Sequence, residues 1–259
     1  MIVRLKRTPI WTCILSLSVL FLAGCSHHST GSAALDQVIN ADYRTWERTI
    51  GPRIWFYEKE LEQLNPHFDL GRRESLTLPI HTVILSLLAM QKKDGVIVEL
   101  GSWTGGGILL MAPHLTHDRS YHAVDTFNAD QMPDEYIQRY LKGRKHFDVF
   151  NDNIAPVRNK VVIHRGFTND VAAAWPRDLK IDLLFIDADH SYKGVSDDWK
   201  NWNRYVRKGG IIAFHDYYDE YTNPQGGYQG LRKFVDQKIV PRTGKNFHFV
   251  RGLAWYVVR

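Results

Sequence analysis

The feature that most constrains the fold is a regular alternation of apolar runs with helical stretches from residue 95 onward. Helical patterns cover 107–115, 134–150, 168–175 and 194–206. The intervening apolar runs are rich in β-branched residues on both faces, as buried parallel strands are, and they cover 96–100, 121–125, 161–165, 182–187 and 210–216. This order predicts a doubly wound α/β sheet with right-handed crossovers.

The chain ends in a different pattern. After a helical stretch around 228–239, the segments NFHFV and LAWYVV are separated only by Arg251 and Gly252, which is a hairpin spacing. We therefore expect a Rossmann-like, mostly parallel sheet of seven strands that finishes with an antiparallel pair. Helical patterns also precede the sheet, and we assign 33–77 to an N-terminal helical cap and 78–259 to the main domain.

The first residues have the pattern of an export signal. Arg4, Lys6 and Arg7 precede an apolar stretch from Ile10 to Leu22, which is too short to span a bilayer comfortably. The stretch ends in Leu-Ala-Gly-Cys at 22–25, which resembles the bacterial lipobox. An ordinary signal peptide or membrane anchor with an incidental cysteine is the alternative interpretation.

The lipobox predicts that residues 1–24 are removed and that Cys25 becomes a lipidated first residue on a polar tether, 25–32. The expected location is the bacterial cell envelope, with a membrane as partner through the anchor. The chain has a formal charge of +5, and removing three cationic residues with the signal leaves +2, too little to argue for nucleic acid. Its 2 cysteines exclude a disulfide scaffold.

The first predicted strand ends in a glycine-rich turn. Glu99 is followed by Gly101 and Gly105, and such glycines let the backbone approach a ligand at a helix N-terminus, although packing alone could also require them. The dinucleotide fingerprint fails because Trp103 occupies its second glycine position, and no phosphate loop is present. Since Glu99 would repel a pyrophosphate, the turn suits a cationic or neutral nucleoside better.

The second predicted strand ends in Asp125. An acidic residue at that place in a doubly wound sheet typically accepts hydrogen bonds from ribose hydroxyls. The alternative is a helix N-cap, a position that Asp favours.

The fourth and fifth predicted strands end in a cluster of carboxylates and imidazoles: Asp187, Asp189, His190, His215 and Asp216. Clustered carboxylates repel one another unless a cation compensates them. Asp187, Asp216 and His215 could hold one divalent ion, with Mg²⁺ or Mn²⁺ favoured by oxygen ligands. The alternatives are N-capping by Asp189 and a structural hydrogen bond from His215.

These motifs together resemble the class I S-adenosylmethionine-dependent methyltransferases. The resemblance covers about Leu78 to Arg259, and its most specific parts are FIDADHSY at 185–192 and KGGIIAFHDY at 208–217. They are similar to metal-dependent O-methyltransferases of the macrocin and mycinamicin type, more distantly to the catechol and caffeoyl-CoA enzymes, and also to cephalosporin-hydroxylase-like proteins. In one respect the chain departs from the methyltransferases named, which commonly carry two acidic groups or Asp-Asn where this chain has His215-Asp216.

The resemblance implies S-adenosylmethionine as the methyl donor and a small-molecule hydroxyl, such as that of a sugar, as the acceptor. It implies a role for each matching residue. The cofactor side would be formed by Glu99, Gly101, Gly105, Asp125, Thr168 and Asp189, with Thr168 near the adenine. Asp187 and Asp216 would hold a divalent ion such as Mg²⁺, and His190, together with Asp187, would take the acceptor's proton.

An export signal and a cytosolic methyl donor point to different compartments, which leaves three hypotheses. The chain is an active O-methyltransferase that meets its cofactor after export or as a shorter cytosolic form. Alternatively, it is an exported, non-catalytic binding lipoprotein that kept the fold. In the third, its metal site carries out hydrolysis or oxidation instead.

Overall fold

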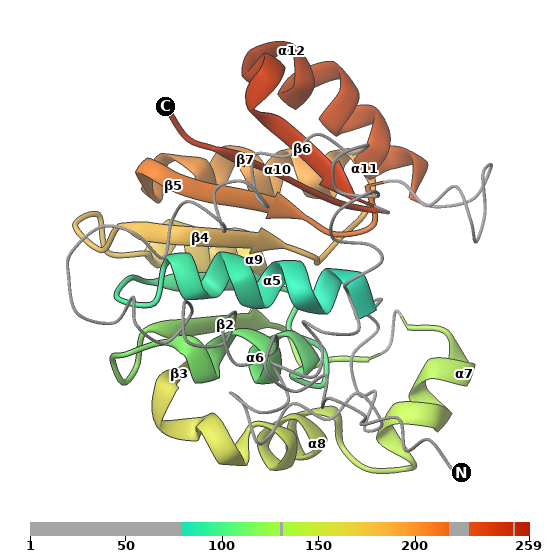
Figure 1. Ribbon diagram of the computed structural model, residues 1–259. Helices are drawn as coiled ribbons and strands as arrows, with labels where there is room; N and C mark the ends of the chain where they lie inside the picture. The colour runs from blue at the N-terminus through green and yellow to red at the C-terminus, as the bar shows by residue number, and fades with distance from the viewer. Residues whose placement is uncertain (1–78, 130–131, 218–227, 251) are drawn as a thin grey trace, which may run out of the picture.

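The computed structural model describes residues 79–129, 132–217, 228–250 and 252–259, and these contain one seven-stranded sheet of order β3-β2-β1-β4-β5-β7-β6 (Figure 1). The strands are β1 (Ile97–Leu100), β2 (Tyr121–Asp125), β3 (Val161–Arg165), β4 (Ile181–Ile186), β5 (Val206–Phe214), β6 (Phe247–Val250) and β7 (Leu253–Val257). Strands β1 to β5 are parallel to one another, and β7 is antiparallel to both β5 and β6. The predicted Rossmann-like sheet is confirmed.

Helices cover both faces of the sheet. The α-helices are α5 (Pro79–Gln91), α6 (Gly106–Met111), α7 (Asp134–Tyr136), α8 (His146–Asn153), α9 (Thr168–Ala174), α10 (Tyr192–Trp202), α11 (Gln229–Phe234) and α12 (Val240–Thr243). Single turns of 3₁₀ or π geometry extend or join them: η4 (Ala112–His114), η5 (Ile137–Leu141), η6 (Ala155–Lys160), η7 (Asn203–Tyr205), η8 (Val235–Ile239) and η9 (Gly244–Asn246). Helices α5, α6 and α8 pack on one face, and α9, α10 and α11 pack on the other (Figure 1).

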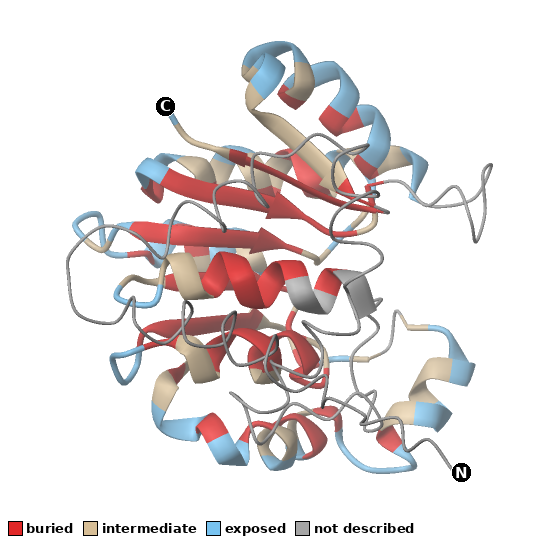
Figure 2. Ribbon diagram, viewed as in Figure 1, coloured by how far each residue is buried: buried red, intermediate tan, exposed pale blue. Residues whose placement is uncertain are grey.

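The central strands β1, β4 and β5 are buried because each supplies apolar side chains to two cores. In β4, Leu183 and Phe185 join the core under α5 and α6, whereas Leu184 and Ile186 join the core under α9 and α10. All six residues of β4 are buried, and Figure 2 shows the same burial along the middle of the sheet. A strand buried on both faces cannot alternate polar with apolar residues, which is why these runs are continuously hydrophobic.

The last strand is inserted between its two antiparallel partners. The turn before β7 includes Gly252, whose φ of +102° is a conformation that favours glycine. Trp255 in the middle of β7 is fully buried and packs into the core that contains α5. Because β6 is antiparallel to β7, it runs in the same direction as β1 to β5, so β7 alone is reversed in the sheet.

One predicted helix is two helices. The helical pattern at 134–150 is interrupted after η5, where Lys142 and Gly143 have φ values of +50° and +78°. Two consecutive left-handed residues end a helix, and a new helix, α8, begins at His146.

The signal segment, Cys25, the tether and the N-terminal helical cap lie outside the described residues. Within the described part of the chain, no helix has the length and apolar character needed to cross a bilayer.

Candidate active site

The candidate site lies where the carboxyl ends of the central strands meet. The chain leaves β1 towards β2 on one side, and β4 lies on the other, so the sheet reverses its winding direction between β1 and β4. This is the place where doubly wound sheets bind ligands. Gly101 N donates to Val124 O at 2.9 Å and Asp187 N donates to Leu100 O at 2.9 Å, which fixes three strand ends against one another.

The glycines after β1 are required by close packing. Gly101 has a φ of +86°, and a Cβ placed there would lie 2.2 Å from the carbonyl oxygen of Asp187. A Cβ on Gly107, at the start of α6, would lie 2.0 Å from Glu99 Oε1. The turn therefore brings a helix N-terminus directly against the Glu99 carboxyl group, and larger residues would separate them.

Glu99 is a buried carboxyl group next to other buried polar side chains. The residue is 2% exposed, and burial raises its pKa from 4.5 to about 8. The side chains of Ser102 and Tyr121 act as its hydrogen-bond partners and lower this pKa against the effect of burial. Because each carboxyl oxygen has two lone pairs, a cationic or polar ligand can still bind to Glu99.

Asp125 connects the loops after β1 and β2. Its Oδ2 accepts a hydrogen bond from Trp103 N at 2.9 Å, and its Oδ1 accepts one from Phe127 N at 2.7 Å. Burial raises the pKa of Asp125, and these two backbone N–H groups oppose the rise. Each carboxylate oxygen has two lone pairs, so both oxygens can still accept a hydrogen bond from a ligand hydroxyl.

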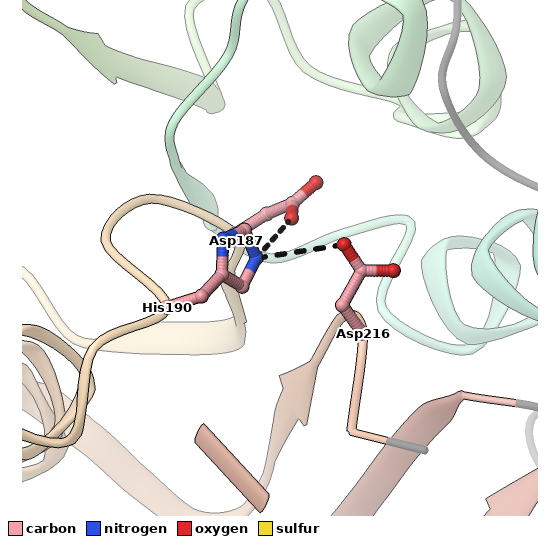
Figure 3. Close-up of side chains that lie close together, drawn as sticks. All are labelled: Asp187, His190 and Asp216. Atoms are coloured by element: carbon pink, nitrogen blue, oxygen red, sulfur yellow. Dashed lines mark hydrogen bonds and ion pairs between the residues drawn. The ribbon is translucent and has the colours of Figure 1, made fainter. Parts of the chain in front are cut away.

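Asp187, His190 and Asp216 gather at the ends of β4 and β5 (Figure 3). His190 Nε2 lies 3.3 Å from Asp187 Oδ1 and 3.7 Å from Asp216 Oδ2. One ligand atom from each of the three residues lies within 4.8 Å of the others. The three side chains are partly exposed, so a substrate or an ion can reach them from solvent.

His215 contacts both carboxylates of this group from the buried side. Its Nδ1 lies 3.2 Å from Asp187 Oδ1 and 3.3 Å from Asp216 Oδ1, and its Nε2 lies 3.0 Å from Nδ1 of His81 on α5. Burial alone would lower the pKa of His215, but the two carboxylates outweigh it and raise this pKa well above 6.5. Without a bound ion, His215 therefore supplies positive charge and an N–H to the site, and its role as a metal ligand stays a prediction.

The charge of His215 has the opposite effect on Asp187. Burial would raise the pKa of Asp187, but His215, followed by His190, outweighs burial and holds this pKa below its usual range. Asp187 is therefore ionised at neutral pH, as both an ion ligand and a partner of a proton-accepting histidine must be.

Strained backbone concentrates around the site. Trp103, Phe127 and Asp216 have φ values of +43°, +51° and +54°, and they follow β1, β2 and β5 respectively. Residues other than glycine seldom adopt positive φ values, and those that do cluster at functional sites. The loop after β5 is held by Tyr217, whose N–H donates to Gly252 O at 2.7 Å and whose hydroxyl donates to Asp236 Oδ1 at 2.6 Å.

Thr168 and Asp189 are engaged elsewhere. The Thr168 hydroxyl donates to Asp198 Oδ1 on α10. Asp189 accepts hydrogen bonds from Ser191 N at 2.8 Å and Ser191 Oγ at 3.1 Å, at the start of α10. The structure thus brings Asp187, His190, His215 and Asp216 together, and it directs the Asp189 carboxylate to the helix start that follows β4.

Two residues of the site were not singled out in the sequence. His81 is 134 positions from its partner His215, and nothing in the sequence indicates that pairing. The ring of Tyr228 stacks on His190 with a centroid distance of 4.0 Å and an interplanar angle of 21°, and Tyr228 is 52% exposed. Only the three-dimensional arrangement shows either contact, because neither residue belongs to a strand-end motif.

Comparison with known proteins supports a methyltransferase. Residues 98–217 match the family described as "Methyltransferase domain", a stretch that runs from β1 to just beyond β5 and contains every strand end discussed above. A curated relative, an uncharacterized protein of Acanthamoeba polyphaga mimivirus, is 29% identical over 151 residues. That match spans 58% of this chain and 64% of the viral protein.

Solved structures share the architecture. An O-methyltransferase from Bacillus cereus in complex with SAH has a TM-score of 0.52 at 18% identity, covering 87% of this chain and 100% of that one. TomG from Streptomyces achromogenes, involved in tomaymycin synthesis and solved with SAM, has a TM-score of 0.53 at 17% identity, with 82% and 98% covered. The O-methyltransferase NovP has a TM-score of 0.55 at 17% identity, with 87% and 98% covered. The fold is that of the class I methyltransferases. Within this methyltransferase fold, the candidate site occupies the carboxyl edge of the sheet.

Proposed function

We propose that this chain transfers the methyl group of S-adenosylmethionine to a hydroxyl group of a small molecule, with a sugar hydroxyl as the best candidate. The observation that carries the proposal is the pair of acidic sites at one sheet edge within the matched methyltransferase region. Glu99 and Asp125 flank the glycine turn, and Asp187 and Asp216 surround His190. Glu99 and Asp125 suit a cationic nucleoside cofactor, whereas Asp187 and Asp216, together with His190, suit proton transfer from a hydroxyl.

The cofactor would lie over the turn after β1. Its sulfonium and ammonium groups are cationic, so the carboxyl group of Glu99 is a favourable neighbour once a ligand draws it into the ionised form. Asp125 would accept hydrogen bonds from the ribose hydroxyls. Gly101 and Gly105 let the ligand approach the backbone. Thr168 and Asp189 stay predicted members of the cofactor site, and their side chains also bind Asp198 and Ser191 respectively.

The donor set at the ends of β4 and β5 fits a divalent cation. The carboxylates of Asp187 and Asp216 suit Mg²⁺ or Mn²⁺, and the imidazole of His190 lies beside them, where it would take the proton of the acceptor. Asp187 and Asp216 would hold the ion, and a bound ion would lower the pKa of the acceptor hydroxyl as a Lewis acid. The imidazolium of His215 already compensates part of the negative charge, so we propose metal assistance rather than an absolute requirement.

The proton of the acceptor hydroxyl would pass to His190. Its Nε2 faces Asp187 and Asp216, which stabilise the imidazolium that forms. Bound S-adenosylmethionine would supply the methyl group: the acceptor oxygen would form the new C–O bond in line as the C–S bond breaks, and the sulfur would leave as the neutral thioether of S-adenosylhomocysteine. Tyr228, stacked on His190, fixes the ring plane and offers an exposed aromatic face to the acceptor.

Titration of the full chain with S-adenosylmethionine in a calorimeter, with and without Mg²⁺, tests the cofactor proposal. We expect micromolar binding, about −8 kcal/mol. His190→Ala should bind the cofactor as wild type does but lose methyl transfer by at least about 100-fold. Full methyl transfer by His190→Ala would contradict the base assignment, and no binding by wild type under either condition would contradict the function.

The export signal favours a second candidate function. Because S-adenosylmethionine is made in the cytosol, an exported chain could instead be a binding lipoprotein that kept the methyltransferase fold. Such a protein would bind a nucleoside, sugar or envelope component, turn nothing over and tolerate His190→Ala. We also propose that Cys25 anchors the protein in the bacterial envelope, which both functions allow.

A further inference from the structure

The sheet edge opposite the candidate site is strongly basic. It consists of the loops that lead into the amino ends of β1 to β5, at the left of Figure 1. We call it the basic edge and define it by six exposed residues, one or more in front of or at the start of each strand: Lys93, Arg119, Arg158, Arg177, Lys180 and Lys208. These exposed cations lie before or at the start of five neighbouring strands, so their charges add along one edge of the sheet.

Acidic groups at this edge are fewer than the cations. Asp94 accepts a hydrogen bond from the Thr116 hydroxyl at 2.7 Å, and Asp118 pairs with Lys160 at 3.2 Å. Asp182 is buried and binds Val96 N at 2.9 Å and Arg207. Asp178 is exposed in the loop before β4. These four carboxylates oppose the six cations of the basic edge together with Lys160 and Arg207, so a positive excess remains.

The two ends of the sheet therefore carry opposite charge. The carboxyl ends of the strands hold Asp125, Asp187, Asp189 and Asp216, whereas the amino ends hold the basic edge. Arg165 at the end of β3 and His215 beside Asp187 offset part of the negative charge at the carboxyl ends. A charge distribution with this polarity orients a molecule next to a charged surface, because an anionic surface attracts one end and repels the other. The carboxyl edge of the sheet, with the candidate site, would then face away from that surface.

We infer that the basic edge docks on an anionic phospholipid membrane. Lys and Arg side chains near such a surface are attracted within about one Debye length, roughly 8 Å at physiological salt. Two independent features select a membrane over nucleic acid: the net charge is modest, and the expected lipid anchor at Cys25 would hold the domain beside a bilayer, where weak attraction suffices. The docked domain would keep its site open to soluble ligands.

Lysine reactivity of the full chain in vesicles tests the docking. The protein is reconstituted into vesicles of phosphatidylcholine alone or mixed with phosphatidylglycerol, and its lysines are acetylated and mapped by mass spectrometry. We expect Lys93, Lys180 and Lys208 to react at least about fivefold more slowly on the anionic vesicles, and the difference to disappear in high salt. Exposed Lys142 and Lys233, which lie away from the basic edge, serve as internal controls.

Charge reversal separates the basic edge from net charge. Arg177→Glu, Lys180→Glu and Lys208→Glu together should abolish the protection of Lys93. The same number of reversals at Lys142, Lys193 and Lys233 should leave it intact. The proposal would be overturned if the lysines of the basic edge were acetylated equally on both vesicle types. It would also be overturned if both triple variants lost the protection of Lys93 to the same extent. Protection without vesicles that grows with protein concentration, which indicates a second copy, or protection by RNA but not by vesicles, would overturn it as well.

Discussion

His215 decides how much positive charge the site carries without an ion. One ring nitrogen lies 3.2 and 3.3 Å from two carboxylates, and the other lies 3.0 Å from His81. Two buried like charges are costly unless a cation compensates them, and here the protein supplies that cation from its own interior. A divalent ion bound by Asp187 and Asp216 would share the same two carboxylates with His215.

His215→Asn should therefore make the site depend more on metal. The amide can donate a hydrogen bond but has no charge, so Asp187 and Asp216 lose their internal cation, and unfolding free energy should fall by about 3 kcal/mol in metal-free buffer. Mn²⁺ should raise the melting temperature of the variant more than that of wild type. His114→Asn removes a half-buried histidine that faces no carboxylate at the site, and it should show no such response. Equal Mn²⁺ shifts in wild type and His215→Asn would contradict the role of His215.

The pKa of Glu99 predicts a stability cost that depends on pH. Because the folded protein raises this pKa from 4.5 to about 8, it favours the protonated group, and stability is lost as pH rises from 4.5 through about 8. Glu99→Gln removes that cost. The variant should be more stable than wild type by a few kcal/mol at pH 8 to 9, since each pKa unit corresponds to about 1.4 kcal/mol. Below pH 4.5 this pH-dependent advantage should vanish.

Urea unfolding at a series of pH values measures this effect, and calorimetry measures its functional counterpart. If Glu99 faces the cationic cofactor, Glu99→Gln gains stability but loses affinity for S-adenosylmethionine. A stability difference that is constant across pH would show that the carboxyl group titrates normally.

At the scale of elements, the strands could be predicted because the apolar pattern of their residues indicates that they are buried. A run such as IDLLFI is apolar on both faces only if helices cover both faces, and β4 is buried throughout. The break before α8 was missed because the apolar periodicity continues across Lys142 and Gly143, while local backbone geometry ends the helix. The His81–His215 contact was missed because it joins α5 to β5 through tertiary packing alone.

The turn between β1 and α6 should tolerate no side chain at Gly101. A methyl group there would meet a backbone oxygen at 2.2 Å, and the φ of +86° adds about 1–2 kcal/mol for any residue with a Cβ. Gly101→Ala should therefore lower the unfolding free energy by more than about 2 kcal/mol and weaken cofactor binding. Gly166→Ala is a matched control because its Cβ would find only Val171 at 3.7 Å, an ordinary contact. If urea unfolding gives both variants the same stability, β1 and β4 are not packed as described.

At the scale of the molecule, the positions of the charged residues say more about function than the net charge of the chain does. The sequence has a formal charge of +5, from which neither end of the sheet could be singled out. The parallel topology sorts the charges: residues that precede strands meet at one edge, and residues that follow strands meet at the other. Because both edges depend on strand direction, a correct fold was needed before the polarity could be recognised.

The proposed lipid anchor at Cys25 would determine whether this charge polarity matters in the cell. Cys25 follows Leu-Ala-Gly, and the chain has one other cysteine, Cys13, inside the segment expected to be removed. Metabolic labelling with palmitate should therefore mark wild type and Cys13→Ala equally and leave Cys25→Ala unlabelled. Loss of the acyl chains should also release Cys25→Ala from washed membranes at high salt, because the remaining attraction of the basic edge is screened under those conditions. Equal labelling of Cys25→Ala and wild type would remove the anchor, and the basic edge would then have to hold the protein at the membrane by charge alone.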